Sequence, residues 1–141
     1  MTAITACAHP GKAAQKIIGA GLAEGMKGRL GSVRIRPIWL LSHAADGTLQ
    51  GGLKAETRYG WLYVEQLWVA ETCRGQGLGS ALLEAAEAEA RRSGCAGVHL
   101  HTLAFQAPAF YAKRGYRQVG QLDGLPPGAA SHWFAKPFEE G

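Results

Sequence analysis

The sequence predicts a mixed α/β fold built on a mostly antiparallel sheet, and two features of the chain indicate it. Three strand-like segments separated by short turns, at 34–42, 49–57 and 60–70, are typical of an antiparallel meander. A long helical pattern at 77–92 then precedes a further strand-like segment at 95–103, and that order requires a crossover connection. We therefore expect one mixed sheet with helices on both of its faces.

The elements before the crossover are indicated by their apolar spacing and their turns. Residues 10–27 show a loose helical spacing of apolar side chains, which internal glycines weaken. The first strand ends before an Asp46-Gly47 turn, and the second strand, at 49–57, is weakly patterned. The segment GWLYVEQLWVA at 60–70 is the strongest strand candidate in the chain.

The elements from the crossover onward alternate between helix and strand. The segment 77–92 places five apolar side chains on one helical face, and Gly94 follows as a helix-ending residue. After the crossover strand, residues 106–116 predict a short helix, and two final strands, at 116–122 and 131–138, close the sheet. The five apolar side chains are Leu78, Leu82, Leu83, Ala86 and Ala90.

Length and composition limit the class of protein. A chain of 141 residues suits a single domain over 1–141. Hydrophobic residues make up 47% and charged residues 18%, which is typical of a globular chain rather than a disordered one. No stretch of 18 apolar residues predicts a membrane span, and no secretory signal is recognised at the N-terminus.

Charge and cysteine content indicate the environment and the partners. The net charge of +4 suits an anionic small molecule, and no cluster of basic residues interleaved with aromatic ones predicts a nucleic-acid site. Cys7, Cys73 and Cys95 are odd in number and widely spaced, so neither a CxxC pair nor a disulfide framework is present. Cysteine usage of this kind favours a reducing, cytoplasmic location.

A glycine-rich stretch, CRGQGLGS at 73–80, lies between the strongest strand and the long helix. A strand, a glycine loop and a helix in this order direct backbone N–H groups and the positive helix end at one point, where phosphate is the preferred ligand. Gly79 is followed by Ser80 without the lysine of a Walker A loop, and the glycine spacing departs from a dinucleotide fingerprint. What remains is R-x-x-G-x-G, with Arg74, Gly77 and Gly79 at its fixed positions. This short pattern alone fits a plain glycine-rich turn equally well.

Two motifs in register make the chain resemble the GNAT superfamily of acyl-CoA N-acyltransferases. R-x-x-G-x-G stands at the start of a long helix, after a strand of the form E-x-L-x-V at Glu65–Val69. Further along the chain, A-x-x-F-Y-x-K-x-G-Y occupies Ala107–Tyr116. The two motifs together are far more specific than either alone, and the resemblance covers about residues 36–138. Ala104 departs from the family, whose members often carry asparagine at that position.

The resemblance implies acetyl-CoA as co-substrate, no metal, and a set of residues that would bind the coenzyme. Backbone N–H groups of the loop would bind the pyrophosphate, and Arg74 would contact its phosphates. The pantetheine arm would pair with the open edge of the strand at 67–69, whose N–H groups would face the developing oxyanion. The expected acyl-CoA-binding residues are Leu67, Trp68, Val69, Arg74, Gly75, Gln76, Gly77, Leu78, Gly79, Ser80, Ala107 and Tyr111.

The implied chemistry is direct attack of a primary amine on a thioester within a ternary complex, and two side chains are candidates for its proton transfers. The resemblance gives Tyr111 the role of acid toward the leaving thiolate, with a half-buried packing residue as the alternative. Glu65 is the candidate base. Strand alternation predicts it on the face of Leu67 and Val69, and a glutamate in so apolar a strand needs a role or a partner. A structural salt bridge, for example with an arginine, explains it equally well.

Other features leave the acceptor open. His99 and His101 lie two residues apart, but no third ligand is visible, so lining of the amine pocket is favoured over a metal. The family's specificity elements correspond to 9–36 and 122–134, which carry no recognisable motif. A small-molecule amine or a protein amine fits this pattern, and a homodimer is common in the family. The alternative function is an acyl-CoA-binding module without catalysis, acting as a regulator or a partner subunit.

Overall fold

The chain divides into two compact units, Met1–Val33 and Arg34–Gly141, and each is described by itself. The described residues of the computed structural model are 2–30, 34–103, 105 and 107–139. Ala104, where the sequence departs from the family pattern, lies outside the described residues. The expected single domain over 1–141 stays a prediction.

The first unit is built around one helix, α1 (Lys12–Leu30). It begins two residues after the predicted start of the helix at 10 and continues three residues past the predicted end at 27. Its apolar side chains are spaced as predicted, and three of them, Ile17, Ile18 and Leu22, are each more than 60% exposed. The loose apolar face predicted here is therefore helical, and these three side chains do not form a buried core.

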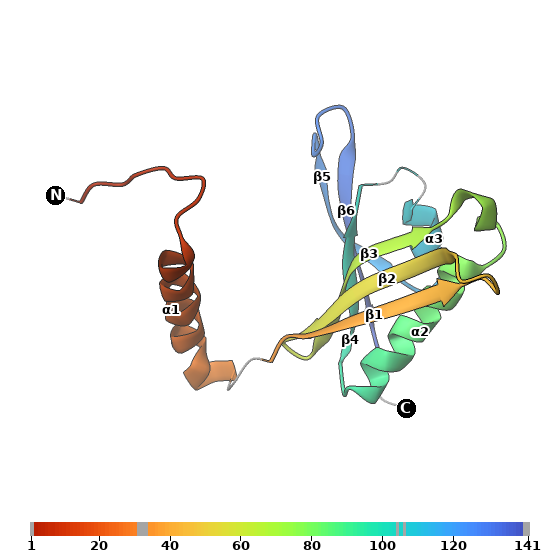
Figure 1. Cartoon of the computed structure of the whole chain (residues 1–141), viewed down its shortest axis with the longest axis horizontal. Coiled ribbons are helices and arrows are strands. Elements are labelled where there is room, and N and C mark those ends of the chain that lie inside the picture. The colour runs from red at the N-terminus through yellow and green to blue at the C-terminus, as the bar shows by residue number, and fades with distance from the viewer. Residues whose placement is uncertain (1, 31–33, 104, 106, 140–141) are drawn as a thin grey trace. The chain divides into compact units, whose positions relative to one another are not determined.

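The second unit is a six-stranded mixed sheet with two helices, shown in Figure 1. Its strands lie in the order β1-β2-β3-β4-β6-β5. Among the described strand pairs, β3 and β4 pair in parallel, because α2 connects them, and the others pair antiparallel. The elements are β1 (Arg36–His43), β2 (Leu49–Arg58), β3 (Trp61–Val69), the 3₁₀ turn η1 (Glu71–Cys73), α2 (Leu78–Arg92), β4 (Gly97–Thr102), α3 (Ala107–Lys113), β5 (Arg117–Asp123) and β6 (Ala130–Pro137). The predicted mixed, mostly antiparallel sheet is confirmed.

The long helix α2 begins and ends as its sequence predicts. Gly77, with φ +82°, precedes its first residue, Leu78. At the other end, the N–H of Cys95 donates to the carbonyl of Ala90, a closure that needs the positive φ of +76° at Gly94. The predicted apolar face of α2 is buried against the sheet and forms one side of the core of this unit. Its fully packed members are Leu82, Leu83, Ala86 and Ala90.

Both helices of the second unit lie against the same face of the sheet. Glu87 of α2 bonds to Lys136, and Tyr111 of α3 packs on Phe134. These two partners are two residues apart on β6 and so point from one face. Helices on both faces of the sheet stay a prediction, because the remaining helix, α1, belongs to the other unit. The opposite face carries aromatic side chains such as Trp39, which is 59% exposed.

Candidate functional site

The site is organised by a gap between two parallel strands. β3 pairs with β4 from Leu62 to Val64, opposite Val98 to Leu100. Within the described residues no further pairing joins these strands, although β3 continues along β2 as far as Val69. The edge of β3 that faces the gap therefore offers backbone N–H and C=O groups to a ligand.

A β-bulge lies where the two strands part. β2 and β3 pair Ala55 with Val64 and then Lys54 with Gln66, so Glu65 is an extra residue of β3 without a counterpart. An extra residue reverses which face each later side chain of the strand occupies. The bulge therefore decides which groups of β3 point to the core and which point away from it.

The sequence prediction for the face of Glu65 is wrong, and the bulge is the reason. Its carboxylate lies on the face opposite the helices, where Oε2 is 3.1 Å from Nζ of Lys54. Leu67 and Val69 pack against the core instead. Simple two-residue alternation fails because it assumes an uninterrupted ladder. The salt-bridge explanation holds, with a lysine in place of the expected arginine, and the role of Glu65 as a base stays a prediction.

The backbone groups of Leu67 and Val69 point into the gap. The N–H of Ala70 donates to a carbonyl of β2 at 2.8 Å, so alternation turns the groups of the even-numbered residues before it toward β2. The carbonyl of Val69 accepts a hydrogen bond from Nε of Arg74 at 3.2 Å, on the open side. Leu67 and Val69 thus stand where a pantetheine chain could pair with them. Trp68 turns its backbone groups to β2 and its half-exposed side chain to the other face.

The loop after β3 presents backbone N–H groups at the start of α2. Gly75 and Gly77 adopt φ of +78° and +82°, a conformation that residues with a Cβ rarely adopt. The N–H of Ala81 makes the first helical hydrogen bond, to the carbonyl of Gly77 at 3.0 Å. The three helix amides before it have no helical partner and are available to a ligand. At Gly79 an added Cβ would lie 3.5 Å from the Phe110 ring, which is an ordinary van der Waals contact.

These amides open into a cavity of about 410 Å³, here called the loop cavity. Phe110 and Arg114 of the α3 region complete its wall. Amide donors, a helix N-terminus and two arginine side chains at one cavity suit a phosphorylated anion. Of the predicted coenzyme-binding residues, five do not line it: Leu67, Trp68, Gln76, Ala107 and Tyr111. Those that do are Val69, Arg74, Gly75, Gly77, Leu78, Gly79 and Ser80.

Arg114, which the sequence did not single out, is the second cation of the loop cavity. Its Nε donates to Oγ of Ser80 at 2.7 Å, and its Nη2 reaches the same oxygen. Its Nη1 donates to the carbonyl of Phe110 at 2.8 Å, and its guanidinium carbon lies 3.9 Å from the centroid of that ring. A signal was present, because Arg114 lies inside the second motif, but at a position that the motif leaves variable. Only folding brings it beside Ser80.

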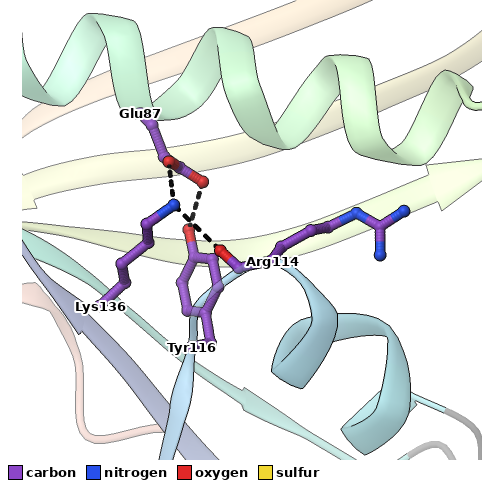
Figure 2. A network of polar contacts seen from close by, with 4 residues as sticks. All are labelled: Glu87, Arg114, Tyr116 and Lys136. Carbon is purple, nitrogen blue, oxygen red and sulfur yellow. Dashed lines mark hydrogen bonds and ion pairs between the residues drawn. The ribbon is translucent and has the colours of Figure 1, made fainter.

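A buried charge network holds the end of α3 near Arg114. Figure 2 shows Glu87 accepting hydrogen bonds from Nζ of Lys136 at 2.7 Å and from the hydroxyl of Tyr116 at 3.1 Å. Nζ of Lys136 also donates to the backbone carbonyl of Arg114 at 2.9 Å. Glu87 is 6% exposed, so these partners replace water around its charge. Burial, and then the nearby Glu87 charge, raise the pKa of Tyr116 far above its ordinary value, which keeps its hydroxyl a donor.

Tyr111 is buried beside the loop cavity rather than in its lining. It is 7% exposed, and its ring contacts the rings of Phe110, Tyr116 and Phe134 at centroid distances of 5.1, 5.7 and 5.6 Å. Burial raises the pKa of the Tyr111 phenol, which keeps it protonated at neutral pH as an acid requires. These observations fit the acid role and the packing alternative alike.

The two histidines of β4 lie on the face away from the helices. The ring of His99 is 5.1 Å from that of Tyr63 and 6.0 Å from that of Trp61, between centroids. His101 stacks on Trp133 at 4.4 Å. Burial lowers the pKa of His99, which favours its neutral form. In the part of the chain that the structure describes, no three His, Cys, Asp or Glu residues are grouped to hold a metal.

Cys7, Cys73 and Cys95 are free thiols, as their spacing predicts. Of the helices described, none is long and apolar enough to cross a membrane.

Several known proteins are similar to this chain. The model of the Acetyltransferase (GNAT) family matches residues 28–116. Blasticidin-S acetyltransferase of Streptomyces morookaense is 46% identical over 91 residues, 64% of this chain and 67% of that protein. An acetyltransferase of Agrobacterium fabrum is 41% identical over 93 residues, 66% of this chain and 68% of that protein. The crystal structure of an acetyltransferase from Bacillus cereus aligns with a TM-score of 0.85 at 28% identity, over 95% of this chain and 98% of that one.

Proposed function

Because the chain belongs to the GNAT family of acetyltransferases, we propose that it transfers the acetyl group of acetyl-CoA directly to a primary amine within a ternary complex. The family and the fold make the chain an acyltransferase. The acetyl donor, the amine acceptor and the roles of individual residues are proposed.

One observation supports the donor assignment above all. The loop cavity joins the free amides of α2 to two arginine side chains, Arg74 and Arg114, next to the open edge of β3. Amides and guanidinium groups would hold the pyrophosphate, and the open edge would pair with the amide chain that follows it. Both features are needed for a molecule that combines phosphates with an extended amide chain.

The chain's own residues would then serve three steps of the transfer. The N–H groups of Leu67 and Val69 on the open edge would donate to the thioester oxygen as negative charge develops there. Attack of the neutral amine nitrogen forms the C–N bond and cleaves the C–S bond. Tyr111 would protonate the departing thiolate, and the amine proton would leave to Glu65 or to water.

We assign the acceptor to the small-molecule amines, with a protein amine as the second possibility. Blasticidin-S acetyltransferase is 46% identical to this chain, and its name places its acceptor among small molecules. Similarity of this kind supports the class of acceptor and not its identity. A homodimer and a cytoplasmic location are proposed on the family resemblance and on the free cysteines.

A thermal melt with acetyl-CoA tests the donor assignment. At about 100 times its dissociation constant, a ligand that binds only the folded state adds roughly 2.7 kcal/mol, which is several degrees for a chain of this size. S-acetyl-pantetheine, which lacks the pyrophosphate, should give a much smaller shift at the same concentration. Equal shifts with the two compounds, or no shift with either, would contradict the assignment.

Release of free thiol on addition of amines tests catalysis. A panel of primary amines is incubated with acetyl-CoA and the protein, and thiol formation is followed over the uncatalysed background. Turnover with a member of the panel supports the transferase. A clear melting shift without turnover of any amine would instead favour the second candidate function, a non-catalytic acyl-CoA-binding module.

A further inference from the structure

A second cavity, here called the ring pocket, lies on the face of the sheet away from α2 and α3. Its volume is about 420 Å³, within the range of small-molecule sites. Its residues on β2, β3 and β4 alternate with residues that pack in the core, so their side chains point to the other side of the sheet, and Tyr59 lies in the turn between β2 and β3. The lining residues are Glu56, Arg58, Tyr59, Trp61, Tyr63 and His99.

The walls of the ring pocket are flat rings in defined positions. The ring of Tyr63 lies 5.1 Å from that of His99 at an interplanar angle of 30°, and Trp61 meets His99 edge-on at 6.0 Å and 71°. Gly97 lies against Trp61: an added Cβ there would be 2.7 Å from Cζ3 of the indole. The indole of Trp61 therefore packs directly against the backbone at Gly97, which is possible because glycine has no side chain. Aromatic faces held in this way suit a ligand that is itself flat.

The charges of the ring pocket are paired. An oxygen of Glu56 is 3.2 Å from Nη2 of Arg58, so the rim offers both an acceptor and donors without a net charge. Burial lowers the pKa of His99, which leaves the imidazole uncharged near neutral pH. Neither an isolated cation nor an anion is favoured by such a lining. A ring with polar atoms on its edge is favoured, because the walls stack on its faces and the rim meets its edge.

The ring pocket reaches the gap between β3 and β4. Tyr63 and His99 are register partners, and the next pair, Val64 and Leu100, is the last before the strands part. One residue along a strand is about 3.3 Å. A molecule bound in the ring pocket could therefore extend a short substituent of its own into the gap. It would enter the gap from the face opposite the loop cavity.

We propose that the ring pocket binds a planar, unsaturated ring of the amine acceptor and directs its amine toward the gap between β3 and β4. The inference rests on the proposed function, which supplies the acyl group in that gap. It narrows the acceptor from primary amines in general to those that carry a flat ring close to the amine.

Equilibrium binding of two matched amines tests the proposal without requiring turnover. Benzylamine and cyclohexylmethylamine have the same charge and a similar size, but only the first has a flat ring. Each is titrated into the ¹⁵N-labelled full chain with coenzyme A present, and the indole N–H signal of Trp61 is followed by NMR. We expect benzylamine to bind about five-fold more tightly, which corresponds to about 1 kcal/mol, the scale of one aromatic pair.

Two variants complete the test. Trp61→Leu identifies the indole signal and should reduce the preference for benzylamine to less than two-fold. Trp39→Leu removes an exposed indole of the same face outside the ring pocket and should leave the preference intact. No response of the Trp61 signal, equal affinities for the two amines, or a preference that survives Trp61→Leu would overturn the proposal.

The outcomes separate this inference from the proposed function. A melting shift with acetyl-CoA together with failure of the amine titration would refute the assignment of the ring pocket to the acceptor and leave the donor assignment unaffected. Ring-selective binding without any acetyl-CoA shift would support the ring pocket as a ligand site and contradict the transferase.

Discussion

Replacement of Arg114 by methionine is the most direct probe of the loop cavity. The substitution removes the guanidinium that bonds to Oγ of Ser80 and to the carbonyl of Phe110, and it keeps an unbranched side chain over the Phe110 ring. A hydrogen bond to a charged group contributes about 1.5–3 kcal/mol. Because the loop cavity is open to water, we expect the lower end of this range. The variant should lose about 1.5–2 kcal/mol of binding free energy, which corresponds to a roughly 10- to 30-fold weaker affinity for coenzyme A.

The assay is calorimetric titration with coenzyme A at constant ionic strength. Lys113→Met is the matched control, because Lys113 is an exposed neighbour that carries the same charge and does not line the loop cavity. We expect a higher Kd for coenzyme A with Arg114→Met and not with Lys113→Met. The kcat at saturating acetyl-CoA should be unchanged, because Arg114 would bind the donor equally in the ground state and in the transition state. A change below two-fold, or the same change in both variants, would refute the assignment of Arg114 to phosphate binding.

Four further predictions follow from the contacts described. Gly77→Val forces a β-branched residue to φ +82°, so coenzyme A binding should be lost while circular dichroism still shows the fold. Tyr111→Phe should lower kcat at least ten-fold with little change in the KM for acetyl-CoA; an equal loss in both would indicate packing. Lys136→Met leaves the carboxylate of Glu87 without its cation, and urea unfolding should show that the free energy of unfolding falls by about 2–3 kcal/mol. This loss is below the value for a fully buried pair because a quarter of the lysine side chain is exposed. Adding Glu87→Leu to Lys136→Met should recover part of the lost free energy. Stability should fall as pH rises above about 10, because unfolded tyrosine ionises there while burial keeps Tyr116 protonated in the folded state, and Tyr116→Phe should flatten that slope.

The sequence predicted the features that depend on neighbours along the chain. The start of α2 after a glycine with positive φ, its end at Gly94 and its buried apolar face follow from local steric rules and helical spacing. The loop that faces the loop cavity was recognised for the same reason, since the order of strand, glycines and helix is contained in one continuous segment. The resemblance to the family was likewise recognised from two such segments, Arg74–Gly79 and Ala107–Tyr116, and the family model matches residues 28–116.

The face of Glu65 was mispredicted because its position depends on the partner strand. The extra residue of the bulge is defined only by the pairing of β2 with β3, and the segment WLYVEQLWV taken alone does not predict it. The part of Trp68 in coenzyme binding stays a prediction, and the direction of its backbone groups likewise depends on the partner strand. Its backbone groups point to β2, and this direction is set by which edge of β3 is paired.

Sequence by itself thus determined the mixed fold, the boundaries of α2 and the glycine-rich loop of this protein, because steric preference and apolar spacing act within a few residues. The tertiary structure alone decided that Arg114 joins Ser80 at the loop cavity, 34 positions apart in the chain, and that Glu56, Tyr63 and His99 line one pocket. These neighbours come from strand register and from helix docking. Both are set by the packing of the whole sheet, where many weak contacts are satisfied together, and not by any single segment.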